Sequence, residues 1–123
     1  MRKKYEVKTN DQIRKMRIAG LLTAKALENV KAAIGPGVTT LELDQIAEKT
    51  IRDGGGRPNF QLVPGYYHTI CASINSEVVH GIPSNKVLEP GDLVSIDCGA
   101  EVDGWNGDSA FSIVVPGLDN DVT

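Results

Sequence analysis

The first part of the chain alternates polar and apolar residues with the period of an α-helix. After Thr9, apolar residues recur every three or four positions as far as Ile34, which predicts an amphipathic helix over about residues 10–34. Thr9 and Gln12 have the spacing of a capping box at its start. Gly35-Pro36-Gly37 should end this helix, because proline cannot continue a helix and glycine accepts the conformation found just beyond helix ends.

A second, shorter helix is predicted directly after this turn. Thr39 and Glu42 repeat the capping-box spacing, and apolar residues mark one helical face as far as Ile51. The glycines at 54–56 follow. They lack the Gly-Lys-Ser/Thr end of a phosphate-binding loop and come after a helix rather than after a strand, so we interpret them as a helix-end linker.

From residue 57 onward the pattern changes to short runs rich in Val, Ile, Tyr and Cys. These runs predict strands at residues 69–75, 77–80, 93–99 and 104–115. Asp103-Gly104 is a hairpin turn signal between the last two runs. Helices followed by antiparallel strands predict an α+β fold, in which the two helices pack on one face of an antiparallel sheet.

Composition narrows the class of protein. The chain has 123 residues, of which 41% are hydrophobic and 24% charged, as in one soluble globular domain or part of one. The net charge is −3 and the basic residues are scattered, so nucleic acid is not an expected partner. No segment approaches the roughly 20 apolar residues of a membrane span. Cys71 and Cys98 are expected to be free thiols in a reducing compartment, and we expect a cytoplasmic protein.

Two aspartates in the predicted hairpin are candidates for chemistry. Asp97 interrupts an apolar run, where an ionised carboxylate is costly unless it is paired or bound to a metal. Asp108 and Asp97 are separated by an odd number of positions. A hairpin whose loop has an even number of residues therefore puts both aspartate side chains on one face of the sheet. They would lie directly opposite each other with a loop at Val102-Asp103 and diagonally with a loop at Asp103-Gly104. A three-residue loop or a bulge would separate them.

We expect the two carboxylates to lie close together on a buried face, where they repel each other, and a shared proton or a bound cation resolves the repulsion. A metal site is therefore one interpretation of Asp97 and Asp108. The structural alternative, which is the commoner one from spacing alone, is that Asp108 caps a turn at Asn106-Gly107 while Asp97 accepts hydrogen bonds from backbone donors.

The chain has two histidines, His68 and His80. His80 is the better functional candidate, because Gly81-Ile82-Pro83 turns the chain sharply after it and can present the ring at the rim of a cleft. His68 we interpret as structural. No serine lies in a Gly-x-Ser-x-Gly elbow, which argues against nucleophilic hydrolase chemistry.

Together, several segments closely resemble the bacterial type I methionine aminopeptidases. They are Lys15-Met16-Arg17-Ile18-Ala19-Gly20, Gly35-Pro36-Gly37-Val38-Thr39-Thr40, Ile70-Cys71-Ala72-Ser73-Ile74-Asn75, Val78-Val79-His80-Gly81-Ile82-Pro83, Pro90-Gly91-Asp92-Leu93-Val94-Ser95-Ile96-Asp97 and Gly104-Trp105-Asn106-Gly107-Asp108. The resemblance implies a pita-bread fold, two related α+β halves around a pair of divalent metals about 3.5–4 Å apart. It also implies removal of the initiator methionine from new proteins, near the ribosome, by a monomeric enzyme.

The resemblance further implies roles for particular residues. Asp97 would chelate one metal and Asp108 would bridge both, with Co, Mn, Fe or Zn equally suited. The metals would activate water for attack on the carbonyl after the methionine. His80 would hydrogen-bond the substrate and stabilise the transition state, while Tyr66 and Cys71 would line the pocket for the methionine side chain.

The chain also departs from the family pattern. The family's remaining metal ligands, a histidine and two glutamates, and a further substrate-binding histidine come after the two aspartates, and nothing after Asp108 here can supply them. Val63-Pro64 also differs from many relatives, which carry aromatic and histidine residues before Tyr66. We therefore expect residues 1–123 to be the N-terminal portion of one catalytic domain and to be inactive alone. Two alternatives are a proline-directed peptidase of the same fold and a non-catalytic pita-bread binding module.

Overall fold

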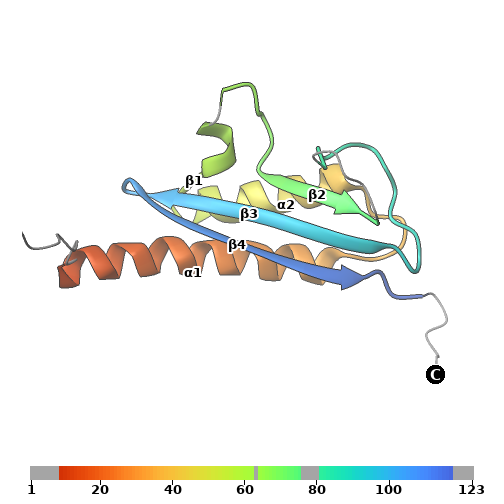
Figure 1. Ribbon diagram of the computed structural model, residues 1–123, viewed down its shortest axis with the longest axis horizontal. Coiled ribbons are helices and arrows are strands. Elements are labelled where there is room, and N and C mark those ends of the chain that lie inside the picture. Colours follow the sequence, from red (N-terminus) through yellow and green to blue (C-terminus); the bar gives the residue numbers. More distant parts are fainter. Residues whose placement is uncertain (1–8, 63, 76–80, 118–123) are drawn as a thin grey trace, which may run out of the picture.

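The computed structural model describes residues 9–62, 64–75 and 81–117. Two helices, α1 (Asn10–Ala33) and α2 (Thr40–Asp53), precede a four-stranded sheet. In chain order the strands are β1 (Arg57–Pro58), β2 (Ile70–Ile74), β3 (Leu93–Val102) and β4 (Trp105–Val114), and a 3-10 turn η1 (Asn59–Leu62) follows β1. All the strand pairs are antiparallel, and the helices cover one side of the sheet (Figure 1). The predicted α+β class is confirmed.

Both helices begin as their sequences predict. The Thr9 side chain accepts the backbone N–H of Gln12 at 3.1 Å, and the Gln12 side chain accepts the backbone N–H of Thr9 at 2.9 Å. Thr39 and Glu42 make the same reciprocal pair at 3.1 and 2.9 Å. Each capping box satisfies two backbone donors that a helix start would leave unpaired. The glycines after α2 end the helix, and Gly55 has a φ of +87° that favours glycine.

Strand β3 is the centre of the sheet. It pairs with β4 over its whole length, with β2 through residues 94–98, and with β1 through residues 100–101. A strand has only two edges, so β1 and β2 share the edge of β3 opposite β4. Neither β1 nor η1 is predicted by the sequence pattern, because a two-residue strand that contains proline shows no alternation. The predicted strand at 77–80 lies outside the described residues.

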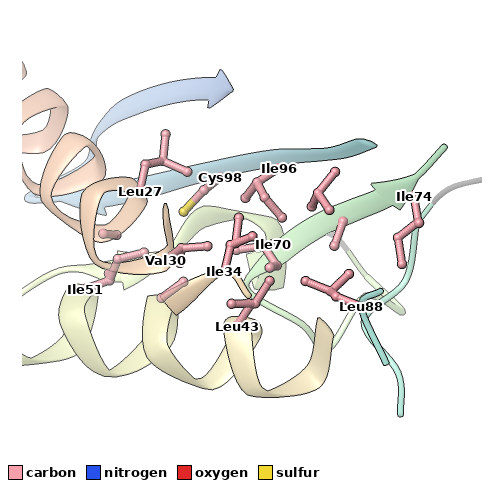
Figure 2. Close-up of a cluster of buried hydrophobic side chains, with 14 of the residues drawn as sticks. Leu27, Val30, Ile34, Leu43, Ile51, Ile70, Ile74, Leu88, Ile96 and Cys98 are labelled. Carbon is pink, nitrogen blue, oxygen red and sulfur yellow. The ribbon is translucent and has the colours of Figure 1, made fainter. Parts of the chain in front are cut away.

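The core lies between the two helices and one face of the sheet (Figure 2). From the sheet it takes Ile70, Ala72, Ile74, Val94, Ile96, Cys98 and Ala100, and from the helices and the residue that caps α1 it takes Ala26, Leu27, Val30, Ile34, Leu43, Ala47 and Ile51. These strand positions alternate with residues that point to the other face. That second face carries the candidate site, since successive side chains of a strand point to opposite sides. No described helix is long and apolar enough to cross a membrane.

Helix α1 is tied to the turn end of the β3–β4 hairpin by one buried hydroxyl. The Thr23 hydroxyl accepts the backbone N–H of Ala100 at 3.0 Å and lies 2.7 Å from the carbonyl oxygen of Gly107, to which it can donate. Gly107 itself packs so tightly that an added Cβ would lie 2.8 Å from backbone atoms of Ala19 and Gly20. This contact fixes the part of the hairpin that carries Asp108.

Candidate metal centre

The hairpin register places the two candidate aspartates on one face. Val102 pairs with Trp105, so the loop is Asp103-Gly104, and both loop residues have positive φ values of 53° and 82° as in a type I′ turn. Asp97 is then opposite Ala110, and Asp108 is opposite Gly99, two positions from Asp97 on the same strand. The aspartates are therefore diagonal neighbours, as the Asp103-Gly104 alternative predicts. The alternative loop at Val102-Asp103 is wrong.

Both aspartates are exposed in this chain, which corrects the expectation that they share a buried face. The apolar neighbours of Asp97 in the sequence, Ile96 and Cys98, point under the helices, whereas Asp97 points away from them. Partial desolvation still raises the pKa of Asp97, and the nearby charge of Asp108 raises it further, while the Cys98 backbone N–H acts in the opposite direction. The two carboxylates therefore repel each other across the diagonal, which a cation placed between them would relieve.

Asp108 is held by a side chain from outside the hairpin. Asn59 on η1 donates its Nδ2–H to Asp108 Oδ1 at 2.7 Å, and the same nitrogen lies 3.4 Å from Asn106 Oδ1. Asn106 and Gly107 lie inside β4 and form no turn, so the structural alternative in which Asp108 caps a turn there is wrong. No sequence signal marks Asn59, because it lies far from Asp108 in the chain and follows a strand too short to recognise.

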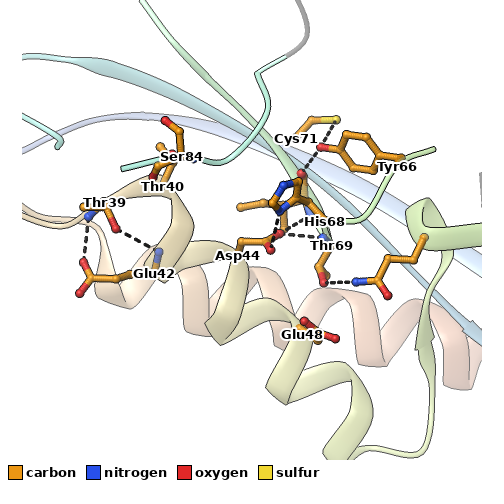
Figure 3. A network of polar contacts seen from close by, with 12 residues as sticks. Thr39, Thr40, Glu42, Asp44, Glu48, Tyr66, His68, Thr69, Cys71 and Ser84 are labelled. Atoms are coloured by element: carbon orange, nitrogen blue, oxygen red, sulfur yellow. Dashed lines mark hydrogen bonds and ion pairs between the residues drawn. The ribbon is translucent and has the colours of Figure 1, made fainter. Parts of the chain in front are cut away.

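Cys71 joins the aspartates on this face, and Tyr66 contacts Cys71. Cys71 is directly across the β2–β3 ladder from Asp97 and is half-buried. The Tyr66 hydroxyl donates to the Ile70 carbonyl oxygen at 2.6 Å and lies 3.5 Å from the Cys71 sulfur (Figure 3). Burial, and then the contact with Cys71, raise the pKa of Tyr66, so this phenol stays neutral. The thiol therefore lies opposite Asp97, and the neutral ring contacts the thiol.

A shallow cavity of about 360 Å³ opens on the same face. Its lining comes from Cys71, Ser73, Ser95, Ile96, Asp97, Ala110, Phe111 and Ser112. Ser95 and Ser112 are cross-strand partners whose hydroxyls are 2.8 Å apart. Asp97 thus borders a hollow that a side chain could enter.

Asp44, which the sequence analysis did not single out, anchors the loop that carries Tyr66. It is a buried residue of α2, and its Oδ1 accepts the backbone N–H groups of Thr69 at 2.7 Å and Ile70 at 2.9 Å. Its Oδ2 lies 3.3 Å from His68 Nδ1 (Figure 3). This contact fits the interpretation of His68 as structural. The available signal was a carboxylate on the buried face of an amphipathic helix, where it needs partners.

His80 lies outside the described residues, but the residue after it is placed. The Gly81 carbonyl oxygen accepts the backbone N–H of Ala72 at 2.7 Å, and a Cβ on Gly81 would lie 2.1 Å from the Ala72 carbonyl oxygen. The backbone at Gly81 therefore lies against β2, one residue from Cys71. Only glycine fits so close an approach.

Asp97 and Asp108 are the residues here that fit a metal. Their carboxylate oxygens are suitable donors for divalent cations, and they converge from adjacent strands. Among the described residues, no group of three or more His, Cys, Asp or Glu side chains could hold a metal ion. The pair therefore supplies part of a coordination sphere.

Comparison with known proteins identifies a class of metal-dependent peptidases, which agrees with a partial metal site at Asp97 and Asp108. The chain belongs to metallopeptidase family M24, whose model matches residues 14–121. It is 55% identical to methionine aminopeptidase 1 of Mycobacterium tuberculosis over 104 residues, which is 84% of this chain and 39% of the relative. Membership of a metallopeptidase family implies use of a divalent metal.

Solved structures show the same fold. The crystal structure of methionine aminopeptidase from Thermotoga maritima matches with a TM-score of 0.85 and 37% identity over 94% of this chain and 47% of that one. Prolidase from Pyrococcus furiosus matches with a TM-score of 0.76 and 28% identity, over 89% of this chain and 31% of that one. The predicted pita-bread fold is confirmed for the region described. The chain spans less than half of the length of these relatives.

Proposed function

We propose that the protein carrying this chain is a methionine aminopeptidase, which removes the N-terminal methionine from newly made proteins by metal-dependent hydrolysis. The diagonal pair Asp97 and Asp108, next to the Cys71–Tyr66 contact, is the observation that carries this proposal. The name of the M. tuberculosis relative supports it. We further propose that residues 1–123 form the N-terminal portion of one catalytic domain.

Asp97 and Asp108 would hold two divalent cations together with ligands from outside this chain, a histidine and two glutamates. Such cations lower the pKa of water and polarise a carbonyl oxygen, which is the chemistry that peptide hydrolysis requires. Oxygen-rich ligation with one histidine suits Co, Mn, Fe or Zn. Asp97 already borders the hollow on the sheet face, so the ligands and the substrate would share that face.

Tyr66 and Cys71 would contact the methionine side chain. The Tyr66 hydroxyl donates a hydrogen bond to the Ile70 carbonyl oxygen, which fixes the ring. The raised pKa keeps the phenol neutral, so the ring presents an apolar surface rather than a charge. Cys71 presents a polarisable sulfur beside it, and sulfur and aromatic groups interact favourably with a thioether. Asp44 would keep this wall in place, because it holds the backbone at Thr69 and Ile70.

His80 would act as the catalytic residue that hydrogen-bonds the substrate near the scissile amide. Support comes from Gly81, whose carbonyl oxygen accepts a hydrogen bond from the Ala72 backbone N–H. Ala72 lies in β2 next to Cys71, and Cys71 is opposite Asp97. As a residue outside the ligand set, His80 would contribute to turnover and not to metal content. We also propose a cytoplasmic, monomeric enzyme whose partner is the N-terminus of nascent polypeptides.

The test uses the whole protein with Mn²⁺ or Co²⁺ and two peptides, Met-Ala-Ser and an Xaa-Pro peptide. We expect hydrolysis of the methionyl peptide, loss of both metal and activity in Asp97→Ala and Asp108→Ala, and loss of turnover with metal retained in His80→Ala. Asp53→Ala is the matched control, because this exposed carboxylate pairs only with Lys49 among the described contacts. Cleavage of the Xaa-Pro peptide alone would favour the proline-directed alternative, and binding without cleavage of either peptide would favour the non-catalytic module.

A further inference from the structure

We propose that Asn59 is a positioning residue that sets the orientation of the Asp108 carboxylate for metal binding. The inference rests on the proposed role of Asp108 as a ligand. Asn59 comes from neither strand of the hairpin, and its amide meets Asp108 over Gly99.

The Asn59 amide makes a directed contact with one oxygen of Asp108. Its Nδ2 donates to Oδ1 at 2.7 Å, a short distance for a bond between an N–H and a carboxylate. A carboxylate has about four lone-pair sites, so one hydrogen bond leaves the others available to cations. Because Asp108 is exposed and would otherwise rotate, this bond selects one orientation from several.

The space for this contact exists because residue 99 is glycine. Gly99 is directly across the ladder from Asp108, and a Cβ there would lie 2.0 Å from Asp108 Oδ1. The same Cβ would lie 2.5 Å from both Nδ2 and Oδ1 of Asn59. The amide and the carboxylate therefore meet over a position without a side chain, and any other residue would push them apart.

The donor and acceptor ends of the Asn59 amide show which of them faces Asp108. Asn59 Oδ1 is buried and has no hydrogen-bond partner among the described residues. Turning the amide over would direct this oxygen at the Asp108 carboxylate, and two acceptors would then repel each other. The arrangement with Nδ2 toward Asp108 is the one that makes a bond, even though it leaves an acceptor unpaired.

The backbone beneath Asn59 is fixed by the sheet. Pro58 pairs with Ala100 in the β1–β3 ladder, and the neighbouring Arg57 forms an ion pair with Glu101 at 2.9 Å. β1 therefore places Asn59 beside the part of β3 that contains Gly99. A donor held in this way stays in place before the metal arrives, which is the property of residues that orient metal ligands.

The experiment measures metal binding by the whole protein in two ways. Calorimetric titration gives the affinity for Mn²⁺, and the visible absorption spectrum of the Co²⁺ form reports the metal environment. Asn59→Ala removes the donor, and Asn59→Leu removes it while keeping a similar volume. Asn29→Ala is the matched control, because Asn29 also donates through Nδ2 to a side-chain oxygen, that of Thr50 at 3.0 Å, between the helices. We expect about tenfold to 100-fold weaker Mn²⁺ binding and a changed Co²⁺ spectrum in both Asn59 variants, with neither change in the control.

The outcomes separate this inference from the proposed function. If the wild-type protein binds neither metal, the role of Asp108 as a ligand fails. If the wild type binds and the Asn59 variants bind equally tightly with the wild-type spectrum, the positioning role is overturned while the proposed function stands. Circular dichroism of each metal-free variant checks the fold, and an Asn59→Leu protein that folds as wild type but binds metal weakly supports the proposal.

Discussion

Asp108 lies directly across the β3–β4 ladder from Gly99, and not from Asp97. The diagonal arrangement keeps the two carboxylates on one face without stacking them in register. It also leaves an empty position beside Asp108 into which the Asn59 amide fits. The hairpin therefore supplies two carboxylates together with the space that one of them needs for an external hydrogen bond.

Substitution of Gly99 by Ala should weaken metal binding. The new Cβ would lie 2.0 Å from Asp108 Oδ1, so Asp108 and Asn59 must both move. We expect a loss of about tenfold or more in Mn²⁺ affinity of the whole protein, measured by calorimetry. Gly35→Ala is the control, since a Cβ there has no neighbour within 4 Å. Equal affinities in the two variants would contradict the tight packing over residue 99.

Substitution of Asp44 by Ala should destabilise the protein and disturb the proposed methionine pocket. The change leaves the backbone N–H groups of Thr69 and Ile70 without their acceptor, at a cost of about 2–4 kcal/mol in the free energy of unfolding. Urea denaturation measures this cost. In the whole enzyme KM for a methionyl peptide should rise, because Tyr66 is in the loop that Asp44 anchors. Wild-type stability would mean that other groups satisfy these donors.

The ion pair between Arg57 and Glu101 should make stability depend on pH. The hydrogen bond from Arg57, and then that from the Gly104 backbone N–H, hold the pKa of Glu101 below its ordinary value of 4.5. The folded state therefore binds this proton less readily than the unfolded state. The stabilisation is fully present above about pH 4.5 and is lost as the pH falls through the lowered pKa.

Glu101→Gln removes this contribution. The difference in melting temperature between wild type and variant should be largest near neutral pH and should shrink as the pH falls below about 4.5. Thermal unfolding followed by circular dichroism at several pH values measures it. A difference that is constant over the whole range would mean that Glu101 stabilises the hairpin without its charge.

The 123-residue chain by itself should hydrolyse no methionyl peptide at a measurable rate. Two carboxylates are only part of a dinuclear coordination sphere, so metal should bind weakly. The assay uses the purified chain with Mn²⁺ or Co²⁺ and Met-Ala-Ser, beside a full-length relative as the positive control. Turnover that disappears in Asp97→Ala would instead show that copies of the chain assemble a working site.

The sequence by itself determined the local backbone structure. For any two-residue loop it also determined that the two aspartates share one face of the sheet. Both capping boxes and the turn signal at Asp103-Gly104 follow from residues close together in the chain, and Asp97 and Asp108 share a face for either two-residue loop. Local backbone conformation sets each of these features. A two-residue turn fixes the register of the strands that it joins, and the alternation of side chains then settles which residues share a face.

The tertiary structure decided what surrounds the aspartates. Cys71 is opposite Asp97, Asn59 holds Asp108, and Asp44 anchors the loop of Tyr66, although each pair lies far apart in the sequence. The exposure of Asp97 depended on which face of β3 the helices cover. No local pattern encodes these relationships, because they arise only when separate elements bury their apolar faces against each other and fix the polar groups on the opposite face.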